Sequence, residues 1–258
     1  MKTLSVIVVT KNEETKIRQC LESVKWADEI VVVDCFSTDE TTTICSQYTD
    51  RVIQREWPGY ASQKNFGIDN ATGEWILILD ADERVSDQLR QEIQVILNSN
   101  PEHDGYQIPF KNYLGNHWLR YGGLYPDYHL RLFKRDKARY GSKEIHETLD
   151  FKGKVGFLSG AVIHLTYDNY EDYLQKVNRY TSLEARYYCN AGYKVSWFEF
   201  VKPIGKFFKL YIFKQGFRDG LPGLVSAVYL TLYMFIRAAK IIEFRKTRFL
   251  DKMEDESN

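Results

Sequence analysis

The sequence predicts an α/β protein with a Rossmann-like, mostly parallel sheet, a shorter antiparallel region and C-terminal amphipathic helices. Over the first hundred residues, apolar β-branched runs alternate with helical patterns. These runs are apolar on both faces, which is typical of parallel strands covered by helices on both sides. After about residue 100 the pattern changes to short aromatic segments such as "DGYQIPFKNYLG", which predict antiparallel strands.

The elements are expected in a regular order. Strands are predicted at residues 4–10, 29–34, 51–56 and 75–80. Helices are predicted at residues 13–24, 38–48, 60–71 and 86–97, the last capped by Ser86 or Asp87, and a long helix at 169–191 with Asn169 as its cap. We expect an α/β half at 1–100, an antiparallel part of the same domain at 101–168, a helical segment at 169–248 and an acidic tail at 249–258.

Composition places the chain among ordinary globular proteins. Its 258 residues are 44% hydrophobic and 27% charged, so disorder is expected only at the acidic tail. The four cysteines show no spacing typical of zinc ligands or of a disulfide scaffold, and reduced thiols fit a cytoplasmic protein. The apolar run at Leu4 to Val9 is too short for a signal peptide, so export is not expected.

Polar residues follow three of the predicted strands. They are Thr10 to Glu13, Asp34 to Asp39, and Asp80 to Glu83. Because ligands of open α/β sheets bind at the carboxyl ends of the strands, we expect these three segments to form one site. No glycine-rich turn follows the first strand, which excludes a dinucleotide fingerprint or P-loop at that position.

The stretch "LDADE" delivers several acids to one strand end. Asp80 and Asp82 share one face of the pleat, and two carboxylates this close repel each other unless a cation lies between them. Mg²⁺ or Mn²⁺ suits such a pair and completes its shell with phosphate oxygens and water. The alternative is a solvated turn that leads into the helix at Ser86.

Three ordered motifs resemble the family 2 glycosyltransferases, whose GT-A domain binds a nucleotide sugar. They are "SVIVVTKNEE", "VVVDCFSTDET" and "QKNFGIDNATGEWILILDADE". Further segments, "GGLYPDYHLRLFKR", "KEIHETL", "HLTYDNYEDYLQKVNRYT" and "FKQGFRDGLPGL", look like the lipopolysaccharide core β-1,4-glucosyltransferase-like branch. This second resemblance covers nearly the whole chain.

The resemblance implies roles for the donor-side residues. Thr10, Asn12 and Glu13 would line the nucleoside pocket, and Asp34 would face the base or ribose. Lys64 would lie near the diphosphate, and Asp80 and Asp82 would serve Mg²⁺ or Mn²⁺, with Asp82 as the direct ligand. The chain departs from the family where Cys35 replaces a second acid and Glu40 replaces glycine. Asp39 or Ser37 alternatively only caps the second helix.

The resemblance also implies an acceptor side. Glu147 in "KEIHETL" would be the catalytic base, with His146 beside the acceptor; the alternative is a surface loop with ordinary charges. Asp172 is a second candidate base, although it also suits the first turn of a helix. Tyr125, Asp127 and Arg131 are candidate acceptor-side residues, with a solvent-facing charge as the alternative for Arg131. His164 is interpreted as structural.

The C-terminal segment is basic and apolar. Residues 199–248 carry ten basic and three acidic side chains, and residues 224–236 are thirteen residues without a charge. A membrane span needs about 20 such residues, so we expect interfacial helices on a membrane surface. The alternatives are that the helices only pack on each other and on the catalytic domain, or that they form a transmembrane hairpin.

Taken with the resemblance, these patterns predict an inverting, metal-dependent glycosyltransferase. It would move a hexose from a nucleotide diphosphate sugar, with UDP-glucose as the default, to a glycan or glycolipid acceptor such as lipopolysaccharide core. It would be cytoplasmic and peripheral on the inner face of the plasma membrane, without nucleic acid as a partner. The alternatives are a sugar nucleotidyltransferase and an inactive membrane-associated scaffold of the same fold.

Overall fold

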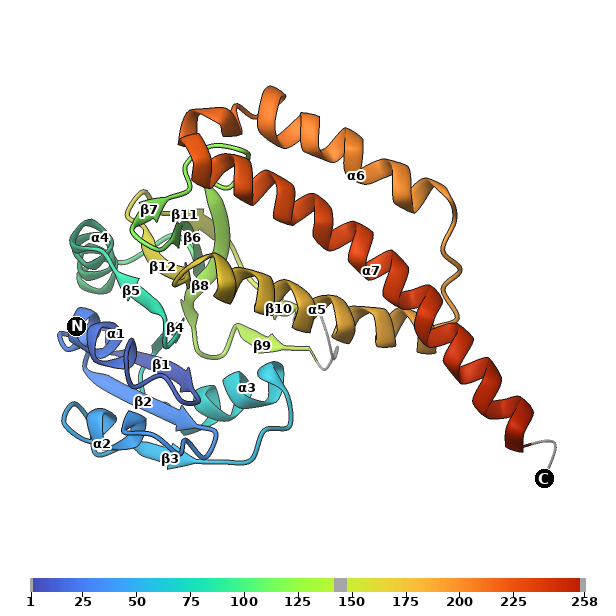
Figure 1. Cartoon of the computed structure of the whole chain (residues 1–258). Helices are drawn as coiled ribbons and strands as arrows, with labels where there is room; N and C mark the ends of the chain where they lie inside the picture. The colour runs from blue at the N-terminus through green and yellow to red at the C-terminus, as the bar shows by residue number, and fades with distance from the viewer. Residues whose placement is uncertain (1, 142–147, 256–258) are drawn as a thin grey trace. The chain divides into compact units, whose positions relative to one another are not determined.

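The computed structural model describes residues 2–141 and 148–255, with side chains as far as Lys246. The chain divides into two compact units, and each is described separately (Figure 1). The first unit comprises Met1–Asn112 and Pro126–Thr166. The second comprises Tyr113–Tyr125 and Tyr167–Asn258.

The first unit is built on a mixed sheet. Its strand order is β3-β2-β1-β4-β8-β6-β12-β5, with β11 paired to β6. The strands are β1 (Leu4–Thr10), β2 (Glu29–Asp34), β3 (Val52–Gln54), β4 (Trp75–Asp80), β5 (Glu83–Val85), β6 (Gly105–Leu114), β8 (Asp127–Lys134), β11 (Val155–Phe157) and β12 (Val162–Tyr167). The first four pair in parallel, and β4 pairs antiparallel with β8. A separate antiparallel pair joins β9 (Ala138–Tyr140) to β10 (Leu149–Phe151).

Helices bury the two faces of the parallel strands. The helices are α1 (Ile17–Val24), α2 (Thr41–Cys45), α3 (Tyr60–Asn70) and α4 (Asp87–Asn98). Val6, Val8 and Leu77 belong to the core under α1, α2 and α4, whereas Ile7 and Ile78 belong to a second core with α3. This alternation follows from the period of two along a strand, and it confirms the predicted α/β sheet with helices on both sides.

Two predicted helix caps are confirmed. The Ser86 hydroxyl accepts a hydrogen bond from Leu89 N at 3.3 Å and begins α4. The Asn169 side chain accepts from Asp172 N at 2.9 Å and begins the long helix α5 (Tyr170–Asn190). Each cap satisfies one of the amide groups that the first turn of a helix leaves without a partner.

Helices dominate the second unit. After α5 come α6 (Phe198–Phe208), the π-helical turn η1 (Lys209–Phe213), the 3₁₀ turn η2 (Gly216–Asp219) and α7 (Gly220–Asp255). The short strand β7 (His117–Trp118) pairs with the end of β6. Figure 1 shows α7 running between α5 and α6, and both helices contact it.

Polar and aromatic contacts fix α7 against α5. Glu184 accepts a hydrogen bond from the Tyr233 hydroxyl at 2.6 Å and forms an ion pair with Arg237 at 2.8 Å. Lys240 Nζ donates to the side-chain oxygen atoms of Asn178 and Thr181 at 2.6 and 2.9 Å. These bonds set the register of the two helices.

The apolar length of α7 exceeds the estimate from its uncharged run. Within the described residues one helix, over residues Gly216–Lys246, is long and apolar enough to cross a membrane by length and composition. The count of thirteen uncharged residues at 224–236 underestimated the apolar length of this helix, because apolar side chains continue beyond the charged residues on either side of that run. Length and composition alone are weak support for a span, since core helices of soluble proteins pass the same test.

Candidate active site at the carboxyl edge of the sheet

The strand ends predicted to form one site do meet. Thr10 is the register partner of Asp34, and Val9 is the partner of Asp80, so the ends of β2, β1 and β4 lie side by side. Thr10 is only 3% exposed, and its buried hydroxyl has no hydrogen-bond partner among the described residues. A buried polar group without a partner costs free energy, which a ligand bound beside it would offset.

The first two strand-end loops are bonded to each other through Asn12. Asn12 has φ +53°, a left-handed conformation that asparagine tolerates better than most residues. The backbone N of Asn12 donates a hydrogen bond to Ser37 Oγ at 2.8 Å, and its side-chain oxygen accepts one from Thr38 N at 2.8 Å. Asn12 therefore holds the loop after β1 against the loop after β2.

Asp34 and Glu13 support the same loops. The buried Asp34 carboxylate accepts from Ser37 N at 2.9 Å and from Gln54 Nε2 at 3.2 Å. Glu13 N donates to Thr41 Oγ1 at 2.8 Å, next to the start of α2. These hydrogen bonds show that Asp34 and Glu13 stabilise the two loops, in addition to any contact with a nucleoside.

Asp80 is held between two cations. Its carboxylate lies 3.5 Å from Lys64 Nζ and 3.3 Å from Arg131 Nη2. Burial alone would raise the pKa of Asp80, but the charges of Lys64 and Arg131 outweigh it and hold the pKa well below its usual range. Asp80 is therefore ionised at any working pH.

Glu83 is the buried centre of this cluster. Its carboxylate accepts from Asp80 N at 2.9 Å and from Arg131 Nη2 at 2.9 Å. Burial raises the pKa of Glu83, although Arg131 acts in the opposite direction. Glu83 thus fixes both the backbone of Asp80 and the guanidinium that faces it.

Asp82 begins a chain of side-chain contacts across three strands. Its carboxylate lies 3.5 Å from His164 Nε2, and His164 Nδ1 lies 2.8 Å from Asn112 Oδ1. Asn112 Nδ2 in turn donates to Asp127 at 3.5 Å, and Asp127 lies 3.0 Å from His129. Burial would lower the pKa of His164, but the contact with Asp82 and the charge of Glu83 raise it.

The acids fit a hard divalent cation that shares its shell with a substrate. Among the described residues, no group of three or more His, Cys, Asp or Glu side chains could hold a metal by itself. Mg²⁺ needs only one or two carboxylates when phosphates complete the shell. Asp82 is 18% exposed and, among the described residues, forms no ion pair with a lysine or arginine, unlike Asp80. The carboxylate of Asp82 is therefore less compensated within the described residues than that of Asp80.

The structure brings together most of the predicted donor-side residues. Thr10, Asn12, Glu13 and Asp34 share the first two loops, and Lys64 reaches Asp80 from α3. Arg131, predicted on the acceptor side, forms ion pairs with Asp80 and Glu83 and is only 12% exposed. The alternative of a solvent-facing charge is therefore wrong.

The predicted acceptor-side residues are not all brought together. Asp127 belongs to the chain of contacts that starts at Asp82, whereas Tyr125 belongs to the second unit, where it packs on Trp118 with ring centroids 5.0 Å apart. Glu147 and His146, the predicted base and its neighbour, lie outside the described residues.

His164 is the residue that sequence reasoning missed. The sequence gives it no partner at metal-ligand spacing, and we interpreted it as structural. Its contact with Asp82 depends on the antiparallel pairing of β12 with β5, in which His164 is opposite Glu83. The role of His164 could have been predicted only from the pairing of its strand with the acidic segment. That pairing is not visible in the sequence.

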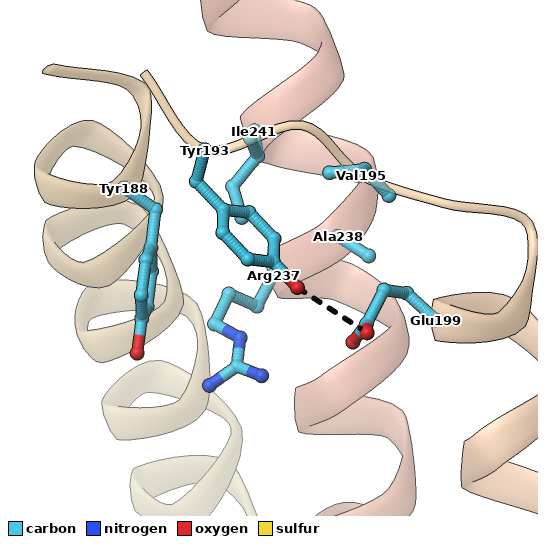
Figure 2. A pocket seen from close by; sticks show the side chains of 7 residues that line it. All are labelled: Tyr188, Tyr193, Val195, Glu199, Arg237, Ala238 and Ile241. Carbon is cyan, nitrogen blue, oxygen red and sulfur yellow. Dashed lines mark hydrogen bonds between the residues drawn. The ribbon is translucent and has the colours of Figure 1, made fainter. Parts of the chain in front are cut away.

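The second unit contains a separate cavity of about 110 Å³ between α5, α7 and the segment before α6. Figure 2 shows that Tyr188, Tyr193, Glu199 and Arg237 point into it, with Tyr193 hydrogen-bonded to Glu199 at 3.3 Å. Arg237 is neutralised by Glu184, and Glu199 by Lys202. The charges around this cavity are thus already paired within the unit.

The fold defines the class of protein. The chain is similar to a mannosyltransferase, PcManGT of Pyrobaculum calidifontis, solved in complex with GDP-Man and Mn²⁺. The TM-score is 0.58 at 16% identity, and the match covers 93% of this chain and 87% of that chain. The mostly parallel sheet is therefore a GT-A glycosyltransferase fold.

The sequence comparisons give the family. The profile of glycosyl transferase family 2 matches residues 5–201. The lipopolysaccharide core biosynthesis glycosyltransferase LpsC of Rhizobium meliloti (strain 1021) is 30% identical, over 98% of this chain and 96% of that protein. The uncharacterized glycosyltransferase RT0209 of Rickettsia typhi (strain ATCC VR-144 / Wilmington) is 31% identical, over 94% and 88%. The chain belongs to the family 2 glycosyltransferases and is an enzyme of that class.

Proposed function

We propose that this glycosyltransferase is an inverting, metal-dependent hexosyltransferase that uses a uridine diphosphate sugar, with glucose as the expected hexose. The observation that carries the proposal is the meeting of Thr10, Asp34 and the acids Asp80 and Asp82 at one sheet edge. This edge would hold the nucleoside of the donor beside the first two loops and its diphosphate beside the acids. The GDP-Man and Mn²⁺ bound to the mannosyltransferase of similar fold support this arrangement.

The cationic groups around Asp80 suit the charge of a diphosphate. Lys64 and Arg131 each carry a positive charge within 3.5 Å of Asp80, so the site has both signs of charge next to each other. Asp82, with Asp80, would hold Mg²⁺ or Mn²⁺, which neutralises charge on the departing nucleoside diphosphate. Arg131 and Lys64 fix the orientation of Asp80 through their ion pairs.

The remaining step is removal of the acceptor proton. Glu147 is the proposed base: it takes the proton of the acceptor hydroxyl as the oxygen bonds to the anomeric carbon and the bond to the diphosphate breaks. Attack opposite the leaving group inverts the anomeric configuration. His146 and Asp127 are proposed on the acceptor side of the same reaction.

We further propose a glycolipid acceptor at a membrane surface, with the protein peripheral on the cytoplasmic side. The lipopolysaccharide core role named for the Rhizobium meliloti relative supports the acceptor class. The second unit exposes large apolar side chains that have no role inside its core: Trp197, Phe198, Ile204, Phe208, Phe213, Phe217 and Leu221. Lysines accompany them at positions 202, 206, 209 and 214, as in helices that lie in an anionic interface.

The first test is calorimetric binding of UDP-glucose with and without Mn²⁺. Metal-dependent binding by the wild type is expected, with a loss of at least about tenfold in affinity for Asp82→Asn, since one ligand charge is removed. The control is Asp136→Asn, which removes an exposed charge of the same unit without touching the site. Binding that ignores both the metal and Asp82 would overturn the proposed site.

A further inference from the structure

Two segments that lie far apart in the sequence form one structure in the second unit. They are residues 117–123, after β6, and residues 209–219, which join α6 to α7. Gly122 N donates to Lys214 O at 2.9 Å, and Tyr121 N donates to the carboxylate of Asp219 at 2.8 Å. The proposed transfer reaction assigns no role to either segment.

Glycine is required in this structure by backbone angle and by space. Gly122 has φ +71° and Gly123 has φ +78°, values at which other side chains are strained. A Cβ on Gly216 would lie 3.0 Å from Leu210 O and 3.4 Å from Gly122 Cα. The side chain of Lys214 runs past Gly123 at ordinary contact distance, 3.7 Å from where a Cβ would stand.

Two arginines lie against Tyr121 in this structure. The guanidinium carbon of Arg218 lies 4.3 Å from the centre of the Tyr121 ring. That of Arg120 lies 5.7 Å from the same ring and 5.3 Å from the Trp118 ring. A lysine, Lys214, runs past Gly123, and the side chains of all three cations are exposed.

The guanidinium groups keep donors for a ligand. Arg218 Nη1 donates to the side-chain oxygen of Gln215 at 2.8 Å, and the other N–H groups of its guanidinium remain to bind an anion.

No carboxylate of the described residues neutralises these cations. Within residues 2–141 and 148–246, none forms an ion pair with Arg120, Lys214 or Arg218. The neighbouring carboxylate of Asp219 is only 6% exposed, and it is already bound to Tyr121 N and lies 3.7 Å from His117. Arg120 and Arg218 carry like charges beside one ring, and an anion that binds both reduces their repulsion.

We propose that Arg120, Lys214 and Arg218 form a phosphate-binding subsite for a phosphorylated sugar of the acceptor glycolipid. Arginine forks match the oxygen pairs of phosphate, and two of them beside a lysine suit a phosphomonoester better than a singly charged diester. Exposed apolar side chains of the same turn, Phe213 and Phe217, are suited to the lipid boundary where such a headgroup lies. The inference rests on the proposed glycolipid acceptor and names the group that the enzyme recognises on it.

The test is binding of the full chain to phosphatidylcholine vesicles. The vesicles carry a synthetic glycolipid with a glucosamine 1-phosphate headgroup, the same glycolipid without its phosphate, or phosphatidylglycerol. The variant is Arg120→Ala/Arg218→Ala. The matched control is Arg179→Ala/Lys194→Ala, which removes two exposed cations elsewhere on the second unit.

The wild type and the control are expected to bind the phosphorylated glycolipid at least about tenfold more tightly than the unphosphorylated one, since hydrogen bonds to a charged phosphate are stronger than those between neutral groups. The variant should lose this preference. A preference that survives in the variant overturns the proposal. Equal binding to phosphatidylglycerol and to the phosphorylated glycolipid also overturns it, because the turn would then respond to any anionic lipid.

UDP-glucose binding of each protein separates the two proposals. Donor binding by the Arg120→Ala/Arg218→Ala variant should equal that of the wild type, because the donor residues belong to the first unit. Normal donor binding without any phosphate preference would therefore refute the subsite alone. Absent donor binding in the wild type would instead refute the proposed function.

Discussion

Adjacent acids of the "LDADE" stretch have different tasks. Asp80 is neutralised by Lys64 and Arg131, and Glu83 is buried against Arg131, whereas the one ion-pair partner of Asp82 among the described residues is His164. A strand end can carry this much negative charge because part of it is compensated inside the protein. The proposed cation would compensate the rest.

Glu83 and Asp82 should therefore respond differently to substitution. Glu83→Ala is expected to lower the free energy of unfolding by about 3 kcal/mol, because it leaves the Arg131 guanidinium and Asp80 N without their buried partner. Glu83→Gln, which keeps an acceptor, should cost less. Asp82→Asn should stay within about 0.5 kcal/mol of the wild type.

Urea denaturation of the three variants measures these differences. Equal destabilisation by Asp82→Asn and Glu83→Ala would show that both acids are structural. A stable Asp82→Asn variant that has lost metal-dependent donor binding would separate the ligand from its support.

At the scale of elements, the sheet could be predicted but part of the site could not. The strand at 75–80 was predicted with its observed bounds, because a buried parallel strand is apolar on both faces. Helix α1 begins at Ile17 and not at residue 13, because Glu13 O closes a turn with Lys16 N first. The contact of His164 with Asp82 follows from an antiparallel register between distant segments, and no local pattern encodes such a register.

Glu29 stabilises the edge of the sheet where β1, β2 and the turn before β4 meet. Its carboxylate accepts hydrogen bonds from Ser5 Oγ and from Thr72 N and pairs with Arg51. Burial alone would raise the pKa of Glu29, but these partners outweigh it and lower the pKa below its ordinary value of 4.5. The folded state therefore holds the ionised form more strongly than the unfolded chain does.

This pKa predicts loss of stability in acid. The contribution of Glu29 is present above its ordinary pKa and is lost as the pH falls towards its lower folded value, since the unfolded chain then takes up the proton first. Glu29→Gln should lower stability at pH 7 by about 1–2 kcal/mol and flatten its pH dependence below about pH 5.

Denaturation curves from about pH 3 to 7 measure this difference. Exposed Glu102 has no such set of partners, and Glu102→Gln serves as the control. An unchanged pH dependence in Glu29→Gln would contradict the assignment.

For the whole molecule, the proposed donor site and the proposed membrane surface belong to different units. The first unit carries the proposed donor residues and the acids, and the second carries the exposed aromatic side chains and most of the C-terminal basic charge. An apolar groove of about 350 Å³ between α6 and α7, lined by Ile204, Phe207, Val228 and Phe235 among others, adds to this surface. The division allows attachment to be altered without altering donor binding.

Replacing two exposed apolar side chains of the second unit tests attachment directly. Phe213 is 80% exposed and Leu221 is 63% exposed, so neither supports the core. Phe213→Ser/Leu221→Ser is expected to weaken binding to anionic vesicles by about tenfold or more, because each side chain buried in the lipid boundary contributes roughly 1.5–3 kcal/mol. Co-sedimentation with vesicles measures the change.

The matched control, Val95→Ser/Phe157→Ser, removes two similarly exposed apolar side chains from the first unit. It should bind vesicles as the wild type does, and both variants should bind UDP-glucose normally. Wild-type binding that is already absent at low salt would refute membrane attachment, because electrostatic attraction to anionic lipid is strongest there. Equal losses in the two double variants would mean that vesicle binding reflects general surface hydrophobicity. A loss confined to the Phe213→Ser/Leu221→Ser variant would instead assign attachment to the segment before α7 and the first turn of α7.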